Sequence, residues 1–492
     1  MIYINLVGHD LVNEVYELIK VFYFDKEIIF VEDLSEYEKG LLVVNRLTEV
    51  NGKLEARTDI YEDNGLILKG TVVDIDEVKV DKSSIRKKIR IGIKQSIYNA
   101  LLSISNVKAP WGILTGIRPV KIVHNLLDEN KSNQEIIGIL TKQYRLDLNK
   151  AQLILDIGKK QRKYLYPLTN NRFSLYISIP FCPTRCLYCS FPSLNINRYR
   201  DKVDDYIDKL IYEIERVGEI MSNKTITTVY IGGGTPSAIS TSQLERVIQA
   251  VYENFHEDTI KEFTVEAGRP DTINNCMLKM LKENRIDRIS INPQTMNDST
   301  LKLIGRHHSS QDIISTYYDA REIGFDVINM DLIVGLPSEG LKEIQYTLDI
   351  VGKLSPENLT VHTLSIKRGS KFINTMDRYK NQMKGQNIIE DMLRETEIFA
   401  KEKGLLPYYL YRQKQIMGNF ENIGYAKEGK ECIYNIKMME EKETVIGLGM
   451  GAVSKIYFPE EDRIERVPNV KSLEEYLERV EEMVNRKALI LS

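Results

Sequence analysis

The sequence predicts an α/β protein whose centre is a parallel sheet of six βα units, arranged as an open, six-stranded partial TIM barrel, (β/α)6. Two observations support this fold class. From Tyr176 onward, short apolar runs alternate with helical patterns of ten or more residues, as in right-handed βα units. Six such units can be counted, fewer than the eight of a closed barrel. We expect an N-terminal α+β domain with a helical connector in residues 1–168, the barrel core in 169–400 and a small C-terminal cap domain in 401–492.

The N-terminal third shows strand patterns, a helical pattern and strong turn dipeptides. Apolar residues between Leu11 and Phe22 recur at helical spacing, while Asn51-Gly52 and Asn64-Gly65 are typical hairpin turns. A helix is expected from Ser84 to about Ile104, and another begins at the capping box Ser132-x-x-Glu135. The expected strands are Ile2–Val7, a run near Glu27–Val31, Leu41–Val50 and Leu66–Val78.

The barrel core is expected to place its chemistry on the loops that follow the strands, because βα barrels bind ligands at the carboxyl ends of their strands. The six expected strands are Leu175–Ile179, Thr227–Ile231, Glu262–Glu266, Arg288–Ile291, Val327–Leu332 and Leu359–Leu364.

A cysteine-rich loop follows the first of these strands. Three of the five cysteines of the chain, Cys182, Cys186 and Cys189, fall within eight residues. Zinc sites usually use paired C-x-x-C arms and four protein ligands, and no second arm is found here. Three cysteinates suit a 4Fe–4S cluster with one iron left open, whereas a zinc knuckle or a fortuitous loop is the alternative.

The spacing C-x3-C-x2-C, preceded by the strand Leu175–Phe181, resembles the signature of radical S-adenosylmethionine (SAM) enzymes. It is most similar to that of the oxygen-independent coproporphyrinogen III dehydrogenases, and among them to the HemZ-type branch. The resemblance implies a 4Fe–4S cluster whose open iron chelates SAM, which an electron cleaves to methionine and a 5′-deoxyadenosyl radical. It also implies a tetrapyrrole substrate and a reducing electron donor such as flavodoxin or ferredoxin.

The resemblance extends to residues at later strand ends. A glycine run after the second strand is expected to expose backbone amides to SAM, and acidic and amide side chains at the next strand ends are expected to hydrogen-bond its ribose and adenine. Arg306 matches an arginine that contacts the SAM carboxylate, and Tyr176 matches a functional tyrosine. The expected SAM-binding residues are Gly232, Gly233, Gly234, Thr235, Glu266, Gln294, Arg306 and Asp331, with Tyr176 as the catalytic residue.

Two positions depart from the best-known coproporphyrinogen dehydrogenases. Ser178 stands where their strand has a histidine, and Phe191 stands where they have a fourth cysteine. Three functions therefore remain open. The leading one is oxidative decarboxylation of coproporphyrinogen III propionates to vinyl groups, giving protoporphyrinogen IX. A haem-binding carrier on the same scaffold is the second, and a nucleic-acid-modifying radical enzyme, suggested only by the basic run from Lys82 to Lys94, is the third.

A substrate with four propionates requires cationic partners, because a buried carboxylate without one is costly. Lys367 and Arg368 follow the sixth strand, and Arg412 with Lys414 lies in the expected lid. Arginine suits bidentate pairing with a carboxylate. We expect Lys367, Arg368 and Arg412 to bind the substrate.

Composition indicates an ordinary globular protein, with 42% hydrophobic and 28% charged residues. The net charge of −3 argues against general nucleic-acid binding, so a nucleic-acid partner is not expected. No apolar run approaches the length of a bilayer and no signal peptide is recognised, so we expect a cytoplasmic protein without a membrane partner. Cys276 and Cys432 are expected to be buried apolar thiols.

Overall fold

The computed structural model describes residues 1–63, 65–79, 84–107, 109–116, 118–367, 369–412 and 420–491. The chain forms two compact units. The first contains Met1–Lys160 together with Tyr411–Phe420, and the second contains Gln161–Leu410 together with Glu421–Ser492. The chain is thus divided near residue 160, and most of the expected cap segment belongs to the same compact unit as the barrel.

The first unit contains a five-stranded sheet in the order β2-β1-β3-β4-β5. β1 runs parallel to β2 and β3, and β3, β4 and β5 form antiparallel hairpins. The strand β4 was missed by the prediction, because charged and polar residues interrupt its apolar alternation. The hairpin turn before it uses positive φ at Asn51 and Gly52, as their dipeptide predicts. The strands are β1 (Ile2–Val7), β2 (Ile28–Phe30), β3 (Leu41–Val50), β4 (Lys53–Glu62) and β5 (Gly65–Asp74).

The expected capping box is confirmed at the start of the helix Asn133–Lys142, where Ser132 and Glu135 each accept a hydrogen bond from the other's backbone N–H. Lys94, from the basic run, is buried and donates to Thr115, and burial, with Arg412 nearby, lowers its pKa to about 7. It therefore does not lie on a solvated basic face, and Lys82 lies outside the described residues. The helices are α1 (Val12–Phe22), α2 (Ile85–Ile104), α3 (Val120–Asp128) and α4 (Asn133–Lys142), and α5 (Leu148–Leu165) runs past residue 160.

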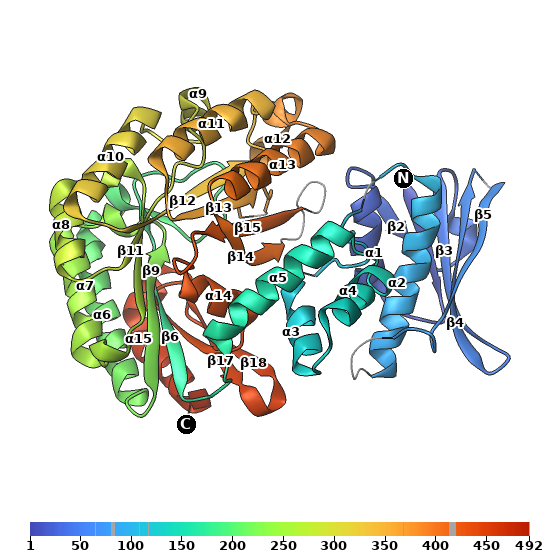
Figure 1. Ribbon diagram of the computed structural model, residues 1–492, viewed down its shortest axis with the longest axis horizontal. Coiled ribbons are helices and arrows are strands. Elements are labelled where there is room, and N and C mark those ends of the chain that lie inside the picture. The colour runs from blue at the N-terminus through green and yellow to red at the C-terminus, as the bar shows by residue number, and fades with distance from the viewer. Residues whose placement is uncertain are drawn as a thin grey trace. The chain divides into compact units, whose positions relative to one another are not determined.

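The second unit confirms the six expected parallel strands, which neighbour one another in sequence order. Each βα unit places its strand in the sheet and its helix outside, as Figure 1 shows for α6, α7, α8 and α10. The strands are β6 (Arg172–Ile179), β9 (Thr225–Gly233), β10 (Glu262–Gly268), β11 (Arg288–Ile291), β12 (Val327–Val334) and β13 (Asn358–Thr363). Two short strands, β7 (Phe181–Cys182) and β8 (Leu194–Asn195), pair at the cysteine loop.

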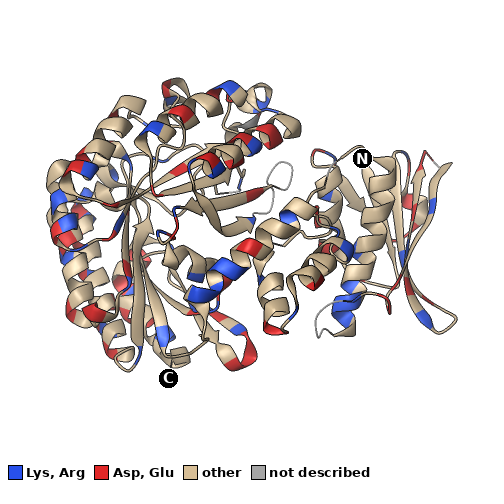
Figure 2. Cartoon of the chain, in the orientation of Figure 1, with Lys and Arg blue, Asp and Glu red and all other residues tan. Residues whose placement is uncertain are grey.

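The outer helices are amphipathic. In α6, apolar residues such as Ile207, Leu210, Ile214 and Val217 are buried, and Glu213 is the buried exception among its charged residues. Figure 2 shows both signs of charge spread over these helices, with few charges on the strands. The helices of this part of the chain are α6 (Val203–Ile220), α7 (Thr241–Asn254), α8 (Asn275–Glu283), α9 (Asp298–Leu303), α10 (Ser310–Ile323), α11 (Leu341–Leu354), α12 (Met376–Tyr379) and α13 (Gln386–Glu402).

The C-terminal segment adds strands at both edges of the six-stranded sheet. β15 lies antiparallel beside β13, and β16 lies parallel beside β6, so the whole sheet has eleven strands. This pairing covers the edges of β6 and β13, and β14 and β18 become the edge strands of the sheet. The elements are β14 (Leu406–Arg412), β15 (Glu421–Ala426), α14 (Ile433–Glu440), β16 (Thr444–Leu448), β17 (Val453–Phe458), β18 (Arg463–Pro468) and α15 (Leu473–Leu491).

Candidate active site

The cysteine loop leaves the carboxyl end of β6, at the edge where βα barrels bind their ligands. Cys182 and Cys186 are buried, and Cys189 is partly exposed. Thr235 donates a hydrogen bond to Cys182 Sγ at 3.4 Å. Burial, with a smaller contribution from the other two cysteines, raises the pKa of Cys182 to about 11. The Cys182 thiol is therefore protonated without a metal, and binding a metal would release its proton.

The donor set suits an iron–sulfur cluster better than a single metal ion. Among the residues that the structure describes, no group of three or more His, Cys, Asp or Glu side chains is arranged around one ion. Three cysteines on one loop, close enough to influence each other's charge, fit such a cluster.

The glycine run at the end of β9 contacts both the cysteine loop and the barrel interior. A Cβ atom on Gly234 would lie 3.0 Å from Cys182 Sγ, and one on Gly232 would lie 2.8 Å from Glu266 Oε2. Gly233 has a φ of 109°, a conformation that favours glycine. The backbone of this run therefore lies between a cysteine and a carboxylate, where it can approach a ligand closely.

Two carboxylates face the barrel interior from β10 and β12. Glu266 accepts a hydrogen bond from Tyr230 at 3.3 Å, and burial together with the charge of Asp331 raises its pKa to about 8. Burial alone would raise the pKa of Asp331, but hydrogen bonds, chiefly from His362, lower it. At neutral pH one carboxyl group is thus protonated and the other ionised. Such a pair can both donate and accept hydrogen bonds toward ribose hydroxyls or an adenine edge.

Gln294 lies beside Asp331 through its backbone. Its N–H donates to Asp331 O at 2.8 Å, and its carbonyl accepts from Ile333 N–H at 2.9 Å. Its φ of 67° is a strained backbone conformation for a residue other than glycine, and the two hydrogen bonds to β12 hold it there.

Tyr176 belongs to a group of three stacked tyrosines that we call the tyrosine stack: Tyr176 on β6, Tyr230 on β9 and Tyr434 on α14. The ring centroids of Tyr230 and Tyr434 lie 4.6 Å apart at an interplanar angle of 22°, and Tyr176 stacks on both at 6.2–6.4 Å. Tyr434 is 3% exposed, and no described residue accepts or donates a hydrogen bond at its Oη. The stack gives the interior an aromatic wall beside Glu266.

Sequence reasoning missed several residues of this site. Tyr230 lies two residues before Gly232, and His362 lies two residues before Leu364, so the alternation of strand side chains could have indicated both. His362 Nε2 lies 3.7 Å from Asp331 Oδ2. No pattern in the nearby sequence indicated that Tyr434 belongs to the site, because α14 lies far from the barrel strands in the sequence. Arg269, immediately after β10, is a buried residue beside the cysteine loop.

Arg306 and Ser178 have defined partners. Arg306 is buried and donates to Asn292 O and, at 3.3 Å, to Tyr188 Oη in the cysteine loop. It is thus placed against the cysteine loop, next to the site expected for SAM. Ser178 donates to Met450 O at 3.1 Å, and its own carbonyl accepts from Tyr206 Oη at 2.6 Å. The serine therefore takes part in packing of the C-terminal segment on β6.

Of the three cations expected to bind substrate, the structure describes Lys367, in the second unit, and Arg412, in the first. Lys367 is partly buried, its pKa is lowered by burial, and it lies close enough to Cys189 to interact with its charge. Arg368 lies outside the described residues. Arg412 is 1% exposed, belongs to the first unit, packs on the Trp111 ring at 4.9 Å and donates to Leu114 O. Its guanidinium is enclosed by these partners, and propionate binding by Arg412 stays a prediction.

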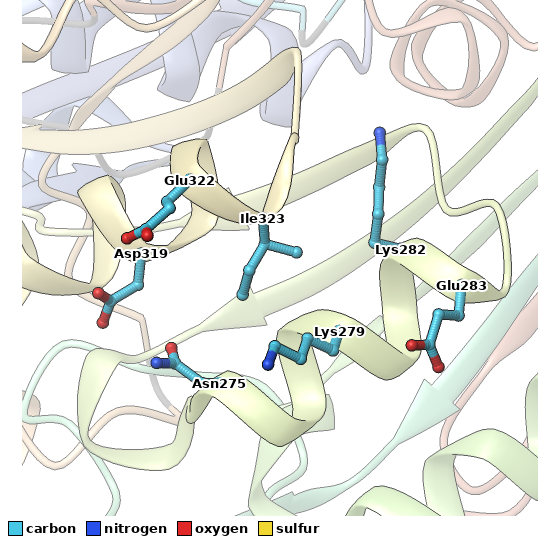
Figure 3. Close-up of a pocket in the computed structure, with 7 residues that line it drawn as sticks. All are labelled: Asn275, Lys279, Lys282, Glu283, Asp319, Glu322 and Ile323. Atoms are coloured by element: carbon cyan, nitrogen blue, oxygen red, sulfur yellow. The ribbon is translucent and has the colours of Figure 1, made fainter.

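A surface hollow of about 560 Å³ lies elsewhere, on the outer face of the barrel between α8 and α10. Figure 3 shows charged side chains of both signs around it, with Lys279 and Glu283 on one helix and Asp319 and Glu322 on the other. This hollow contains no residue of the candidate site. Near it, Cys276 is exposed, so the expectation of a buried thiol is wrong there, whereas Cys432 is buried as expected.

Comparisons with known proteins identify the family of this chain. Residues 176–351 match the model of the radical SAM superfamily. The chain is 41% identical over 406 residues to the oxygen-independent coproporphyrinogen-III oxidase-like protein HemZ of Bacillus subtilis, covering 82% of this chain and 81% of that protein. It is 31% identical over 280 residues to the heme chaperone HemW of the same organism, covering 57% and 70% of the two chains.

The fold also resembles that of coproporphyrinogen III oxidase (HemN) from Escherichia coli, a radical SAM enzyme. The TM-score is 0.53 at 25% identity, and the match covers 66% of this chain and 73% of that one. Within the described part of the chain, no helix has the length and apolar character needed to cross a membrane.

Proposed function

Because the chain belongs to the radical SAM superfamily, in the group that contains the HemZ-type coproporphyrinogen-III oxidase-like proteins, we propose that it decarboxylates coproporphyrinogen III without using oxygen. Each reacting propionate loses carbon dioxide, one hydrogen atom and one electron and becomes a vinyl group, the electron passing to an external one-electron acceptor, so that the product is protoporphyrinogen IX. When bound, the 4Fe–4S cluster and SAM of this family supply a one-electron cleavage that yields a radical able to abstract a hydrogen atom.

One observation carries the proposal: the glycine run touches both Cys182 and Glu266. A ligand held by the glycine backbone would therefore lie beside the cysteine loop and reach the interior carboxyl groups. We assign the cluster to Cys182, Cys186 and Cys189. SAM binding is assigned to Gly232, Gly233, Gly234, Thr235, Glu266, Gln294, Arg306 and Asp331.

Substrate positioning is assigned to Tyr176 and to two cations that follow the sixth barrel strand. Tyr176 keeps its proton, because burial and the charge of Glu266 raise its pKa, and its ring lies in the tyrosine stack. A flat apolar macrocycle suits such an aromatic wall. Lys367 and Arg368 are assigned to the propionates. We place the reaction in the cytoplasm, with a low-potential donor such as flavodoxin or ferredoxin supplying the electron.

A haem-binding carrier is the second candidate, because Phe191, at the position of the fourth cysteine, is 62% exposed and Ser178 is used for packing. One anaerobic incubation separates the two. With a reductant, SAM and coproporphyrinogen III, we expect carbon dioxide and protoporphyrinogen IX, measured by chromatography after oxidation of the porphyrins. Stable haem binding without product would instead support the carrier.

Matched variants make this test specific. Cys186→Ala should abolish both SAM cleavage and product, because a methyl group cannot replace a thiolate ligand. Cys276→Ala, at the exposed cysteine outside the loop, should keep the activity of the wild type. Product formation by Cys186→Ala would contradict the proposed cluster site.

A further inference from the structure

Arg269 is a buried cation that lies against the cysteine loop. It follows β10 and is 3% exposed. Its Nη1 lies 4.0 Å from Cys186 Sγ, and the same nitrogen donates to Thr184 Oγ1 at 2.8 Å and to Thr184 O at 3.3 Å. The guanidinium thus holds the loop at Thr184 and directs an N–H group toward a sulfur proposed to bind iron.

The other side of the same guanidinium is paired with Asp271. Arg269 Nε and Nη2 donate to the two oxygens of Asp271 at 3.0 and 2.8 Å, and His308 Nδ1 lies 3.1 Å from Asp271 Oδ1. Burial would raise the pKa of Asp271, but the hydrogen bonds from His308 and Arg269 outweigh it and lower the pKa. Arg269 and Asp271 therefore form a fixed ion pair that points from β10 toward Cys186.

We propose that Arg269 is a positioning residue that raises the reduction potential of the bound cluster through Cys186, while Asp271 offsets part of this effect. The inference rests on the proposed cluster site. Reduction adds negative charge to a cluster, so a nearby positive charge and an N–H group directed at a ligand sulfur favour the reduced form. The effect is strong where water is excluded, because the charges are then weakly screened.

The experiment compares variants with opposite changes of charge at this ion pair. Arg269→Gln removes the positive charge and should shift the midpoint potential to a more negative value. Asp271→Asn removes the negative charge and should shift the potential to a more positive value. Arg269→Lys keeps the charge but loses the fork geometry, and its potential should lie between those of wild type and Arg269→Gln. The measurement is a redox titration of the reconstituted full-length protein, followed by electron paramagnetic resonance, without SAM.

A purely structural role would give a different pattern. If both substitutions only loosened the loop, their potentials would move in the same direction. Such a result, or unchanged potentials in both variants, would overturn the inference. If Arg269→Gln assembles no cluster, the test rests on Asp271→Asn alone. A midpoint potential of Asp271→Asn that is not higher than that of wild type would then overturn the inference. Arg246→Gln, at an exposed ion pair with Asp208 on the outer helices, is the matched control and should leave the potential unchanged.

The outcome also separates this inference from the proposed function. Wild-type protein that assembles no cluster would contradict the proposed function itself. Wild-type protein with a cluster and product formation, combined with no opposite shifts in the variants, would overturn only the role of Arg269.

Discussion

Glu266 shows how one side chain can be prepared for a ligand at a cost in stability. Its carboxyl group keeps a proton in the folded protein up to a pH of about 8, because burial and Asp331 raise its pKa from the ordinary value of 4.5. In the unfolded chain the same group ionises at about the ordinary value. The folded state therefore holds more protons between these two pH values, and its stability falls as pH rises through that window.

Glu266→Gln removes this dependence, because an amide cannot ionise. We expect the unfolding free energy of the variant, relative to that of wild type, to rise by about 1–3 kcal/mol from pH 5 to pH 8. This is less than the full ~1.4 kcal/mol per unit of pKa shift, because the side chain is partly exposed. Urea denaturation of the ligand-free protein at both pH values measures it. Glu481→Gln, at an exposed position of α15, should show no such gain. If the unfolding free energies of Glu266→Gln and wild type differed by the same amount at pH 5 and pH 8, the protonated state of Glu266 would be contradicted.

Gly234 tests how closely the glycine run must approach the cysteine loop. A Cβ atom there would lie 2.7 Å from Phe181 O and 2.9 Å from Pro180 C, both backbone atoms that cannot move alone. Gly234→Ala should lower stability by about 1–3 kcal/mol and reduce cluster content several-fold, because Cys182 is displaced. Iron and sulfide analysis after anaerobic reconstitution measures the second effect.

The control is Gly138→Ala in α4, where a Cβ atom meets nothing within 4 Å. Alanine there should stabilise the helix by about 1 kcal/mol and leave the cluster content unchanged. Full cluster content in Gly234→Ala would show that the loop tolerates the added carbon.

At the scale of elements, a buried ion pair attaches the C-terminal helix to the barrel. Glu213 on α6 and Lys487 on α15 are both fully buried, with Oε1 and Nζ 2.7 Å apart. Glu213 also accepts hydrogen bonds from Tyr476 Oη at 2.6 Å, from Asn469 Nδ2 at 2.8 Å and from Gly449 N–H at 2.7 Å. One carboxylate thus joins α6, α15 and the turn that follows β16.

Lys487→Met leaves this carboxylate buried without its cation. We expect a loss of about 3–5 kcal/mol of unfolding free energy, as for other buried pairs that lose one partner. Arg486→Met, one position earlier, removes only an exposed ion pair with Glu482 and should cost less than about 1 kcal/mol. Denaturant titrations measure the unfolding free energy of the two variants. Similar losses of unfolding free energy in both would contradict the assigned role of Lys487.

The parts of this structure that the sequence predicts are those with a local signal. The barrel strands were found because apolar runs and helical periods alternate, and the cysteine loop because its three thiols lie within eight residues. The pairing of Glu213 with Lys487, the stacking of Tyr434 on Tyr230 and the enclosure of Arg412 by Trp111 depend on contacts between distant segments. Local periodicity carries no information about such partners.

At the scale of the molecule, every described residue proposed to hold the cluster or SAM lies in the second compact unit. A fragment of residues 161–492, with 411–420 replaced by a Gly/Ser linker, should therefore fold and take up iron and sulfide like the full chain. The replaced segment belongs to the first unit and would lose its partners in the fragment. Iron content and visible absorbance measure the uptake. A folded fragment without a cluster, beside a loaded full-length protein, would show that the site requires residues 1–160.

The pairing of β6 with β16 has a consequence for synthesis on the ribosome. β6 emerges first, whereas its parallel partner, in register from Phe173–Thr444 to Ile177–Leu448, emerges only after all the other strands of the barrel. The backbone of Gly449 then packs on the carbonyl of Ser178, just before the cysteine loop. Until that moment the strand that leads into Cys182 has one open edge. Insertion of iron and sulfide into a finished loop is therefore a step that follows the synthesis of β16.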